Sequence, residues 1–185
     1  MAETPSSMIP LGTIAPDFNL LDTTTHAFCS LQNIKSPHAT VIIFMCNHCP
    51  YVKLIQQKLV EIANVYQQKG ITFIGICSND IKNYPADHPD LMREEAKKHH
   101  YPFPYLYDET QIVAKAYHAA CTPDLFVFDG NLKCVYRGRF DDATPGNGRP
   151  VTGKDLSSTL DNLLAGKPIN PDQQPSVGCN IKWKK

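Results

Sequence analysis

The chain has 185 residues, 42% of them hydrophobic and 19% charged, which suits one globular domain with a full core and excludes a disordered chain. Its 18 basic residues balance its 18 acidic residues, so no charge excess points to nucleic acid as a partner. No apolar run approaches the about 20 residues of a membrane span. We therefore expect a single domain over residues 1–185, with an extended tail at 167–185 and no membrane contact.

The cysteines indicate a reducing compartment. There are seven of them, an odd number, and their spacing follows no disulfide framework. The first residues, Met1-Ala-Glu-Thr-Pro-Ser-Ser7, lack the basic and apolar regions of a secretory signal. Thiols in a chain without an export signal are mostly reduced, so we expect a cytoplasmic protein.

The first elements along the chain are expected to be extended. Residues 1–16 are rich in Pro, Ser and Thr and predict an extended leading segment. Residues 17–22 alternate in polarity, which is typical of an edge strand or a hairpin arm, and a turn at 23–26 follows. A loop at 27–38, with a short turn near 31–34, completes this N-terminal hairpin extension.

A buried strand then leads directly into a long helix. The run 41–45 is β-branched or aromatic at four of its five positions and too short to be a helix by itself. Pro50 suits the first turn of a helix, where its missing N–H has no partner to lose. The following apolar positions recur at helical spacing, and Gly70 marks the stop; they are Val52, Ile55, Leu59, Ile62 and Val65.

A second buried strand is predicted at 71–77, so the unit 40–77 is a strand–helix–strand unit with parallel strands and a right-handed crossover. Asp90 is the expected N-cap of the next helix, with Glu94 near the capping-box position. Asp129-Gly130-Asn131 predicts a hairpin turn. The remaining expected elements are a polar loop at 78–90, a helix at 91–99, an extended segment at 101–106, a short helix at 110–118, strands at 124–128 and 133–138, and a helix at 152–164. Together they predict an α/β fold with a central mixed sheet flanked by helices.

Two cysteines, Cys46 and Cys49, stand at the predicted junction between strand and helix. A helix N-terminus carries partial positive charge and unpaired N–H groups, and a thiol pKa near 8.5 can fall to about 3.5–7.5 in such a place. Cys46 comes first and is the expected exposed attacking thiolate, and Cys49 can close a disulfide onto it. His48, between them, either tunes the thiols when protonated or is simply a solvated loop residue.

With these cysteines, Thr122-Pro123 before a hairpin makes the chain resemble the thioredoxin fold. Ala15-Pro16-Asp17-Phe18 and Asp129-Gly130 are similar to motifs of its redoxin branch, which includes the alkyl hydroperoxide reductase/thiol-specific antioxidant group and the TlpA-like proteins. The chain also looks like a little-characterised group within the thioredoxin family. The stretches that carry this likeness are Cys46-Asn-His-Cys-Pro-Tyr-Val52, Tyr101-Pro-Phe-Pro-Tyr-Leu-Tyr-Asp108, Cys121-Thr-Pro-Asp124 and Val177-Gly-Cys-Asn-Ile-Lys-Trp183.

The resemblance implies a cis peptide bond before Pro123, facing Cys46. It also implies that a substrate strand pairs with the Thr122 backbone while a mixed disulfide forms on Cys46. Asn47 and His48 are the expected tuning residues, together with Thr122 and Pro123 on the substrate side.

The chain departs from the thioredoxin pattern in one respect and from the peroxiredoxin pattern in another. Thioredoxins carry a buried acid in the strand before the cysteines, and residues 40–45 contain none. Asp80, just after the second strand, is a candidate to replace it in proton transfer to Cys49. The peroxiredoxin pattern Pro-x-x-x-Thr-x-x-Cys fits neither Cys46 nor Cys49, which argues against efficient peroxidase catalysis.

The sequence therefore predicts a thiol–disulfide oxidoreductase without metal or other cofactor. Its expected partners are disulfides of proteins or small molecules and a cellular dithiol reductant. The first alternative is a thiol peroxidase in which Cys46 is oxidised and then resolved by Cys49 or Cys121. The second is a non-catalytic metal- or partner-binding module, in which zinc would need two further ligands from Cys121, Cys179 or a distant histidine.

Two further cysteines stay open at this stage. Cys121 is either a buried small residue or a third redox thiol near the site. Cys179 is expected to pack, with a resolving thiol as the alternative. The sequence leaves the oligomeric state and the direction of electron flow undetermined.

Overall fold

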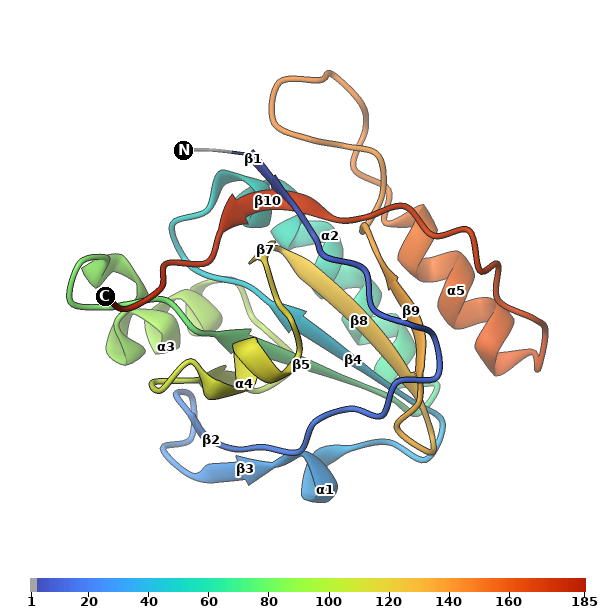
Figure 1. Ribbon diagram of the computed structural model, residues 1–185, viewed down its shortest axis with the longest axis horizontal. Coiled ribbons are helices and arrows are strands. Elements are labelled where there is room, and N and C mark those ends of the chain that lie inside the picture. The colour runs from blue at the N-terminus through green and yellow to red at the C-terminus, as the bar shows by residue number, and fades with distance from the viewer. Residues whose placement is uncertain (1–2) are drawn as a thin grey trace.

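The computed structural model describes residues 3–185 and builds them around a mixed sheet of seven strands, in the order β3-β2-β6-β5-β4-β8-β9 (Figure 1). The strands are β2 (Asn19–Asp22), β3 (Phe28–Ser30), β4 (Ala39–Phe44), β5 (Ile71–Cys77), β6 (Tyr105–Tyr107), β8 (Asp124–Asp129) and β9 (Cys134–Gly138). β4, β5 and β6 are parallel, and the other pairs are antiparallel. The predicted hairpin arm at 17–22 is confirmed, but β2 is not an edge strand, because β3 covers its outer side.

The helices follow the predicted order with small differences at their ends. They are α1 (Leu31–Ile34), α2 (Pro50–Gln67), α3 (Pro89–Lys98), α4 (Ile112–Ala116) and α5 (Lys154–Leu164), and a 3-10 turn, η1 (Pro85–Asp87), interrupts the predicted loop at 78–90. α3 begins earlier than predicted: His88, not Asp90, is its N-cap, and the His88 side chain accepts a hydrogen bond from the Asp90 N–H.

The buried face of α2 turns away from the predicted stripe near its end. Val52, Ile55, Leu59 and Ile62 are buried as expected, but Val65 is 51% exposed and Tyr66 is buried in its place. At 3.6 residues per turn, a step of four from Ile62 stays over the sheet more closely than a step of three does here.

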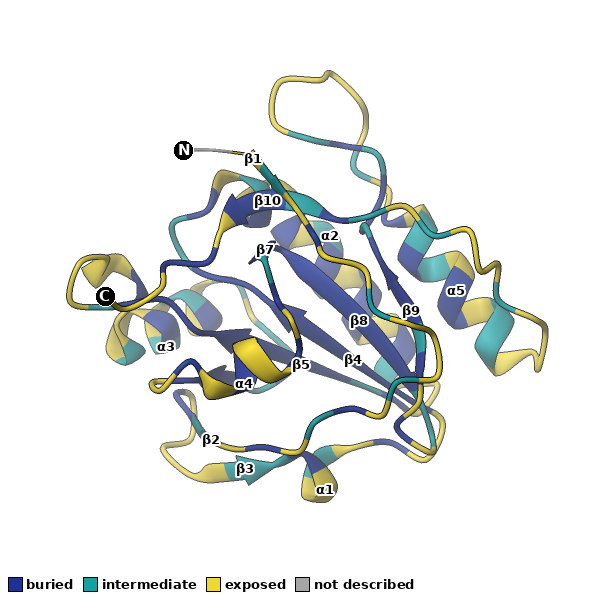
Figure 2. Cartoon of the chain, in the orientation of Figure 1, coloured by how far each residue is buried: buried dark blue, intermediate teal, exposed yellow. Residues whose placement is uncertain are grey.

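Two hydrophobic clusters lie on the two faces of the sheet. Alternate residues of β4 point to opposite faces, so Val41 and Ile43 belong to one cluster and Ile42 and Phe44 to the other. The first cluster includes side chains of α2, α3 and α5, and the second includes side chains of α1, α4 and the N-terminal segment. Figure 2 shows the central strands buried throughout, which explains why β4 reads as a continuous apolar run.

A second, small sheet joins the two ends of the chain. Its order is β1-β10-β7, with β1 (Glu3–Pro5) and β7 (Cys121–Thr122) on either side of β10 (Val177–Asn180). The tail after α5 therefore runs back over the start of α2, where β10 is drawn in red in Figure 1. This arrangement places the tail directly over the Cys46–Cys49 region.

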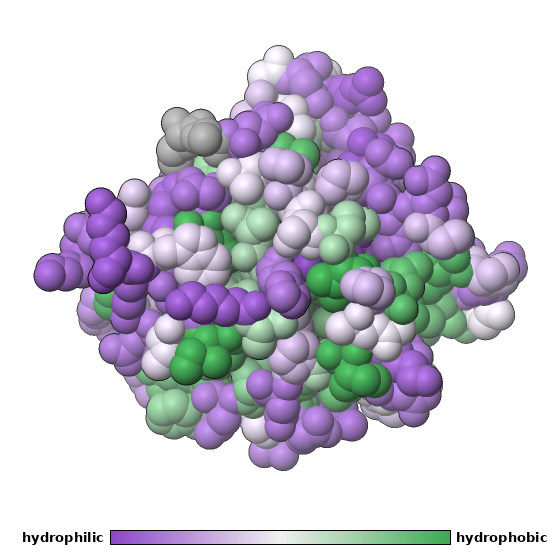
Figure 3. All heavy atoms as spheres, in the orientation of Figure 1, coloured by the Kyte–Doolittle hydropathy of each residue, from purple (hydrophilic) through white to green (hydrophobic). Residues whose placement is uncertain are grey.

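The surface has no feature of a membrane protein in the part of the chain that the structure describes. No helix among residues 3–185 is long and apolar enough to cross a membrane. On the face that Figure 3 displays, hydrophobic side chains form separate patches between hydrophilic ones.

Candidate active site

Cys46 and Cys49 lie where β4 ends and α2 begins. Cys49 is the N-cap of α2 and Pro50 its first residue, as the sequence predicts. Both cysteines are buried: Cys46 is 2% exposed and Cys49 0%. The expectation of an exposed Cys46 is therefore wrong for this conformation, because the segment around Thr122 and the C-terminal tail cover the two sulfurs.

Thr122 and Pro123 lie against the cysteine pair. The peptide bond between them is cis, as the resemblance implied. The Cys49 thiol donates to the Thr122 carbonyl oxygen at 3.0 Å, and the Thr122 hydroxyl lies 3.6 Å from the Cys46 sulfur. These contacts bring together two segments that are far apart in the sequence.

Asp87, a residue that the sequence analysis did not single out, completes this site. Its carboxylate is 0% exposed and lies 2.7 Å from Nδ1 of His48. It also accepts hydrogen bonds from the backbone N–H of Asn47 at 2.9 Å and from the Asn79 side chain at 2.8 Å. Asp87 therefore holds both residues that separate the two cysteines.

Asp80 does not have the role that the sequence suggested. Its carboxylate accepts from the Lys82 N–H and the Asn83 side chain, within its own loop. η1 instead carries Asp87 inward. A hint in the sequence is the frame Pro85-Ala-Asp87-His-Pro89, which restricts the backbone around one acid, but nothing local links it to His48.

His48 is held on three sides. Its Nδ1 lies 3.9 Å from the Cys46 sulfur as well as against Asp87. Its ring stacks on Tyr84 with a centroid distance of 5.6 Å, and the Lys182 ammonium group lies 5.5 Å from the centroid of the Tyr84 ring. Its Nε2 is buried and has no hydrogen-bond partner among the described residues. The ring is thus fixed beside Cys46, with 20% of its side chain exposed.

Hydrogen bonding between the two thiols separates their acidities. The hydrogen bond from the Cys46 thiol lowers the pKa of Cys49 to about 4. Further hydrogen bonds from Thr122, Cys179 and the Val52 backbone N–H act in the same direction, although burial opposes the shift. The same bond raises the pKa of Cys46 well above its ordinary value, as do burial and the nearby Asp87 carboxylate. At neutral pH the reduced pair therefore carries one proton and one negative charge.

Three possible metal ligands meet in this site. The Cys46 sulfur, His48 Nδ1 and an Asp87 oxygen all lie within 4.8 Å of one another, the one such group among residues 3–185. Zinc accepts ligands of these types. In this structure, however, the hydrogen bonds from His48, Asn47 and Asn79 already occupy the Asp87 carboxylate. A bound ion would therefore have to replace the contact between His48 and Asp87.

The other cysteines near the site differ in what they contact. Cys179 is 2% exposed and shares a hydrogen bond with Cys49, a contact that the expectation of simple packing did not include. Burial and the hydrogen bond to Cys49 raise the pKa of Cys179 to about 12. Cys121 points its thiol to the Pro123 carbonyl oxygen at 3.6 Å. Burial raises its pKa, followed by the effect of the Asp124 charge.

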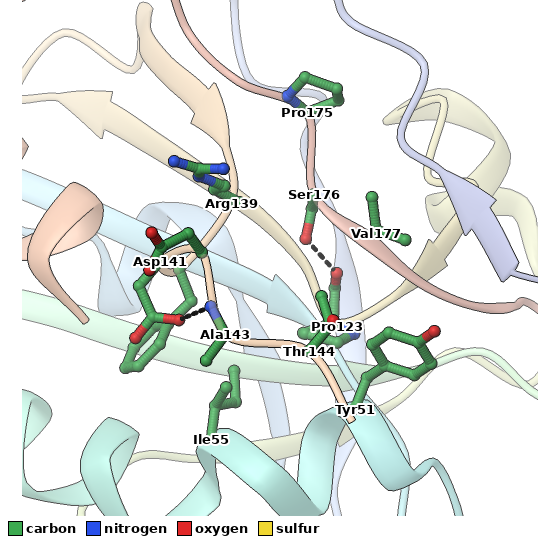
Figure 4. A pocket seen from close by; sticks show the side chains of 12 residues that line it. Tyr51, Ile55, Pro123, Arg139, Asp141, Ala143, Thr144, Pro175, Ser176 and Val177 are labelled. Carbon is green, nitrogen blue, oxygen red and sulfur yellow. Dashed lines mark hydrogen bonds between the residues drawn. The ribbon is translucent and has the colours of Figure 1, made fainter. Parts of the chain in front are cut away.

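A small cavity of about 100 Å³ opens on the other side of Pro123 (Figure 4). Tyr51 and Ile55 of α2 form one wall, and Ser176 and Val177 of the tail form another. The Ser176 hydroxyl donates to the Pro123 carbonyl oxygen at 2.6 Å, so the tail is fixed to this rim.

Comparison with known proteins agrees with this arrangement. The AhpC/TSA family matches residues 11–137 of the chain. An uncharacterized conserved protein from Geobacillus kaustophilus has a similar crystal structure, with 54% identity and a TM-score of 0.98, over 100% of this chain and 97% of that chain. A hypothetical protein from Sinorhizobium meliloti 1021 is similar at 45% identity and a TM-score of 0.95, over 98% of each chain.

A more distant likeness concerns the fold alone. The thioredoxin domain of a thiol-disulfide oxidoreductase from Bacteroides vulgatus has 15% identity and a TM-score of 0.62, over 83% of this chain and 99% of that chain. The predicted thioredoxin-like fold is thereby confirmed. A comparison with curated proteins finds no match.

Proposed function

Because the chain belongs to the AhpC/TSA family of thioredoxin-like redox proteins, we propose that it is a thiol–disulfide oxidoreductase with Cys46 and Cys49 as its dithiol. One observation carries the proposal: the two thiols share a hydrogen bond at the N-terminus of α2, directly against the cis Thr122–Pro123 bond. A helix N-terminus stabilises a thiolate, and a neighbouring thiol within reach can close the disulfide.

Cys46 is the proposed attacking residue. Cys49 is fully buried with its thiol on the Thr122 carbonyl oxygen, whereas Cys46 lies beside the partly exposed His48. The proton of the Cys46 thiol moves to Cys49 along their hydrogen bond, which leaves the thiolate on Cys46. This thiolate attacks one sulfur of the substrate disulfide, a bond forms between them, and the substrate S–S bond breaks.

Cys49 then completes the reaction. It gives its proton to the first departing substrate thiolate and attacks the Cys46 sulfur. The Cys46–Cys49 bond forms, and the second substrate thiolate leaves and takes a proton from solvent. The substrate gains two electrons and the protein loses two. A dithiol reductant reverses this oxidation, and the opposite net direction follows the same steps backwards.

His48 and Asp87 are the proposed positioning pair. Asp87 fixes the Nδ1 side of the imidazole ring, so a protonated ring would place its charge beside the Cys46 sulfur. Asn47 is fixed by the same carboxylate and by Tyr105, whose hydroxyl donates to the Asn47 side-chain oxygen at 3.1 Å. The backbone between the two cysteines is therefore held from both residues.

The proposal includes substrates and a compartment. Disulfides of proteins or small molecules are the proposed substrates, and a cellular dithiol is the proposed reductant. All seven cysteines are free thiols in this structure, and a reducing compartment such as the cytoplasm would keep them so.

A rapid-kinetic comparison on the fully reduced protein tests the proposal. One reaction uses hydrogen peroxide and the other a small disulfide, and thiol trapping with peptide mapping then locates the bonds. We expect fast reaction with the disulfide, ordinary thiolate reactivity with peroxide, and a Cys46–Cys49 bond. Cys46→Ser should abolish the reaction, whereas Cys134→Ser, on β9, should not change it. Peroxide oxidation faster by orders of magnitude would instead establish a thiol peroxidase.

A further inference from the structure

The tail occupies the position that the resemblance assigned to a substrate strand. β10 pairs antiparallel with β7, with Cys179 opposite Thr122 and Asn180 opposite Cys121. On its other side β10 pairs with β1, where Cys179 lies opposite Glu3. Gly178 makes this approach possible, because a Cβ atom there would lie 2.0 Å from the Thr122 carbonyl oxygen. Any substrate strand would have to displace the tail from this edge.

The tail is fixed on both sides of Cys179. Before it, the Ser6 N–H donates to the Ser176 carbonyl oxygen at 2.7 Å. After it, the Ile181 N–H donates to the Ala120 carbonyl oxygen at 3.2 Å, and the Lys182 N–H donates to the Asn79 side chain at 2.8 Å. The Cys179 thiol is thus held on a strand of fixed register, in hydrogen-bond contact with Cys49.

We propose that Cys179 is a third redox thiol, which exchanges with the Cys46–Cys49 disulfide and forms a Cys49–Cys179 disulfide. This proposal rests on the proposed function, because that reaction supplies the first disulfide. In the exchange, the Cys179 thiolate attacks the Cys49 sulfur, the Cys46–Cys49 bond breaks, and Cys46 leaves as a thiolate. The proton lost by Cys179 ends on Cys46, so no external oxidant is needed.

The charge around Cys179 favours this exchange in the oxidised state. After burial, the hydrogen bond and the charge of Cys49 are the main causes that raise the pKa of Cys179, and Lys182 lowers it. The Cys49 charge disappears when Cys49 enters a disulfide with Cys46. Cys179 then ionises more easily than in the fully reduced protein.

The exchange would have a consequence for catalysis. It returns Cys46 to the thiol form while the oxidising equivalent stays between Cys49 and the tail. The tail is then bound covalently over β7, at the edge where a substrate strand would add. A second attack by Cys46 gives a mixed disulfide that Cys49 cannot resolve until a reductant opens the Cys49–Cys179 bond.

A redox titration of the full chain tests this inference. The protein is equilibrated with mixtures of reduced and oxidised dithiothreitol, free thiols are alkylated, and the disulfides are located by peptide mapping. In the wild type we expect Cys46–Cys49 and Cys49–Cys179 bonds. In Cys46→Ser we expect the Cys49–Cys179 bond alone, and in Cys46→Ser/Cys179→Ser no bond at Cys49.

Cys121→Ser is the matched control, because Cys121 is equally buried on the neighbouring strand but donates to Pro123. It should leave both bonds unchanged. The inference is overturned if the wild type forms Cys46–Cys49 while Cys49 and Cys179 stay reduced in Cys46→Ser at every ratio. That outcome leaves the proposed function intact. A wild type that forms no Cys46–Cys49 bond contradicts the proposed function instead. The wild-type map needs no variant, so misfolding of a mutant cannot hide the result.

Discussion

The Asp87 carboxylate lies 2.7 Å from Nδ1 of His48 and is fully buried beside Cys46. It is thus an acid next to the first cysteine, although no acid occurs in the strand that leads to the cysteines. Its charge raises the pKa of Cys46, and its hydrogen bonds orient the two residues between the cysteines. The site therefore combines a fixed anion, a fixed imidazole ring and two coupled thiols.

Replacement of Asp87 should change the acidity of the thiol pair. In Asp87→Asn the negative charge is gone, so we expect the pKa of Cys46 to fall, and we expect a loss of about 1–3 kcal/mol in unfolding free energy from disturbed buried hydrogen bonds. The pH dependence of alkylation of Cys46 measures the first effect, and urea unfolding measures the second. Asp80→Asn is the control and should leave the thiol titration unchanged. An unchanged titration in Asp87→Asn would show that the carboxylate does not act on Cys46.

The reduction potential should depend weakly on pH. The pKa of Cys49 is about 4 and that of Cys46 is well above its ordinary value, so between about pH 5 and 8 the reduced pair holds one proton. Reduction of the disulfide then takes up one proton with two electrons, and we expect the potential to fall by about 30 mV per pH unit. Equilibration with dithiothreitol buffers across this range measures the slope. A slope of about 59 mV per unit would mean that two protons are bound and that no thiolate is stabilised.

The buried ion pair between Arg137 and Asp124 should stabilise the fold in a pH-dependent way. Both side chains are 0% exposed, and the nitrogen and oxygen lie 2.9 Å apart. Arg137→Met leaves an unpaired buried carboxylate, so we expect a loss of about 3–5 kcal/mol in unfolding free energy at pH 7. Burial already raises the pKa of Asp124 to about 6, against the opposing effect of Arg137, and loss of the arginine raises it further.

The sign of the pH effect follows from this shift. A carboxyl group whose folded-state pKa is raised favours folding when protonated, and this contribution is lost as pH rises from its unfolded value of about 3.9 through the folded value. Arg137→Met should therefore be less destabilising at pH 5 than at pH 7, as urea unfolding at both values would show. Equal losses at the two pH values would contradict a charged Asp124 at neutral pH.

Gly178 should be essential for the position of the tail. Gly178→Ala places a Cβ atom against the Thr122 carbonyl oxygen, so β10 must move away from β7. We expect a loss of about 1–3 kcal/mol in stability and faster alkylation of Cys179 in the reduced protein. Val177→Ala removes side-chain atoms on the same strand without adding any, and should leave Cys179 protected. Slow alkylation of Cys179 in both variants would mean that the close approach at Gly178 does not hold the tail in place.

The sequence determined the central part of the fold because its signals are local. The apolar run at 41–45, Pro50 and the spacing of Val52, Ile55 and Leu59 specify a strand, a helix start and a buried helix face over short distances. Where the predictions were wrong, neighbouring contacts decided: His88 rather than Asp90 caps α3, and Tyr66 rather than Val65 faces the core.

The details of the candidate site depended on the tertiary structure. Asp87 is 39 residues away from His48 in the sequence, and no periodicity relates them; the turn η1 alone brings the carboxylate inward. Cys179 reaches Cys49 because the tail pairs with β1 and β7, so that both ends of the chain meet over the helix N-terminus. Contacts of this kind depend on the path of the whole chain. The residue types in the sequence therefore indicate the redox chemistry, and the packing of distant segments decides which groups surround the sulfurs.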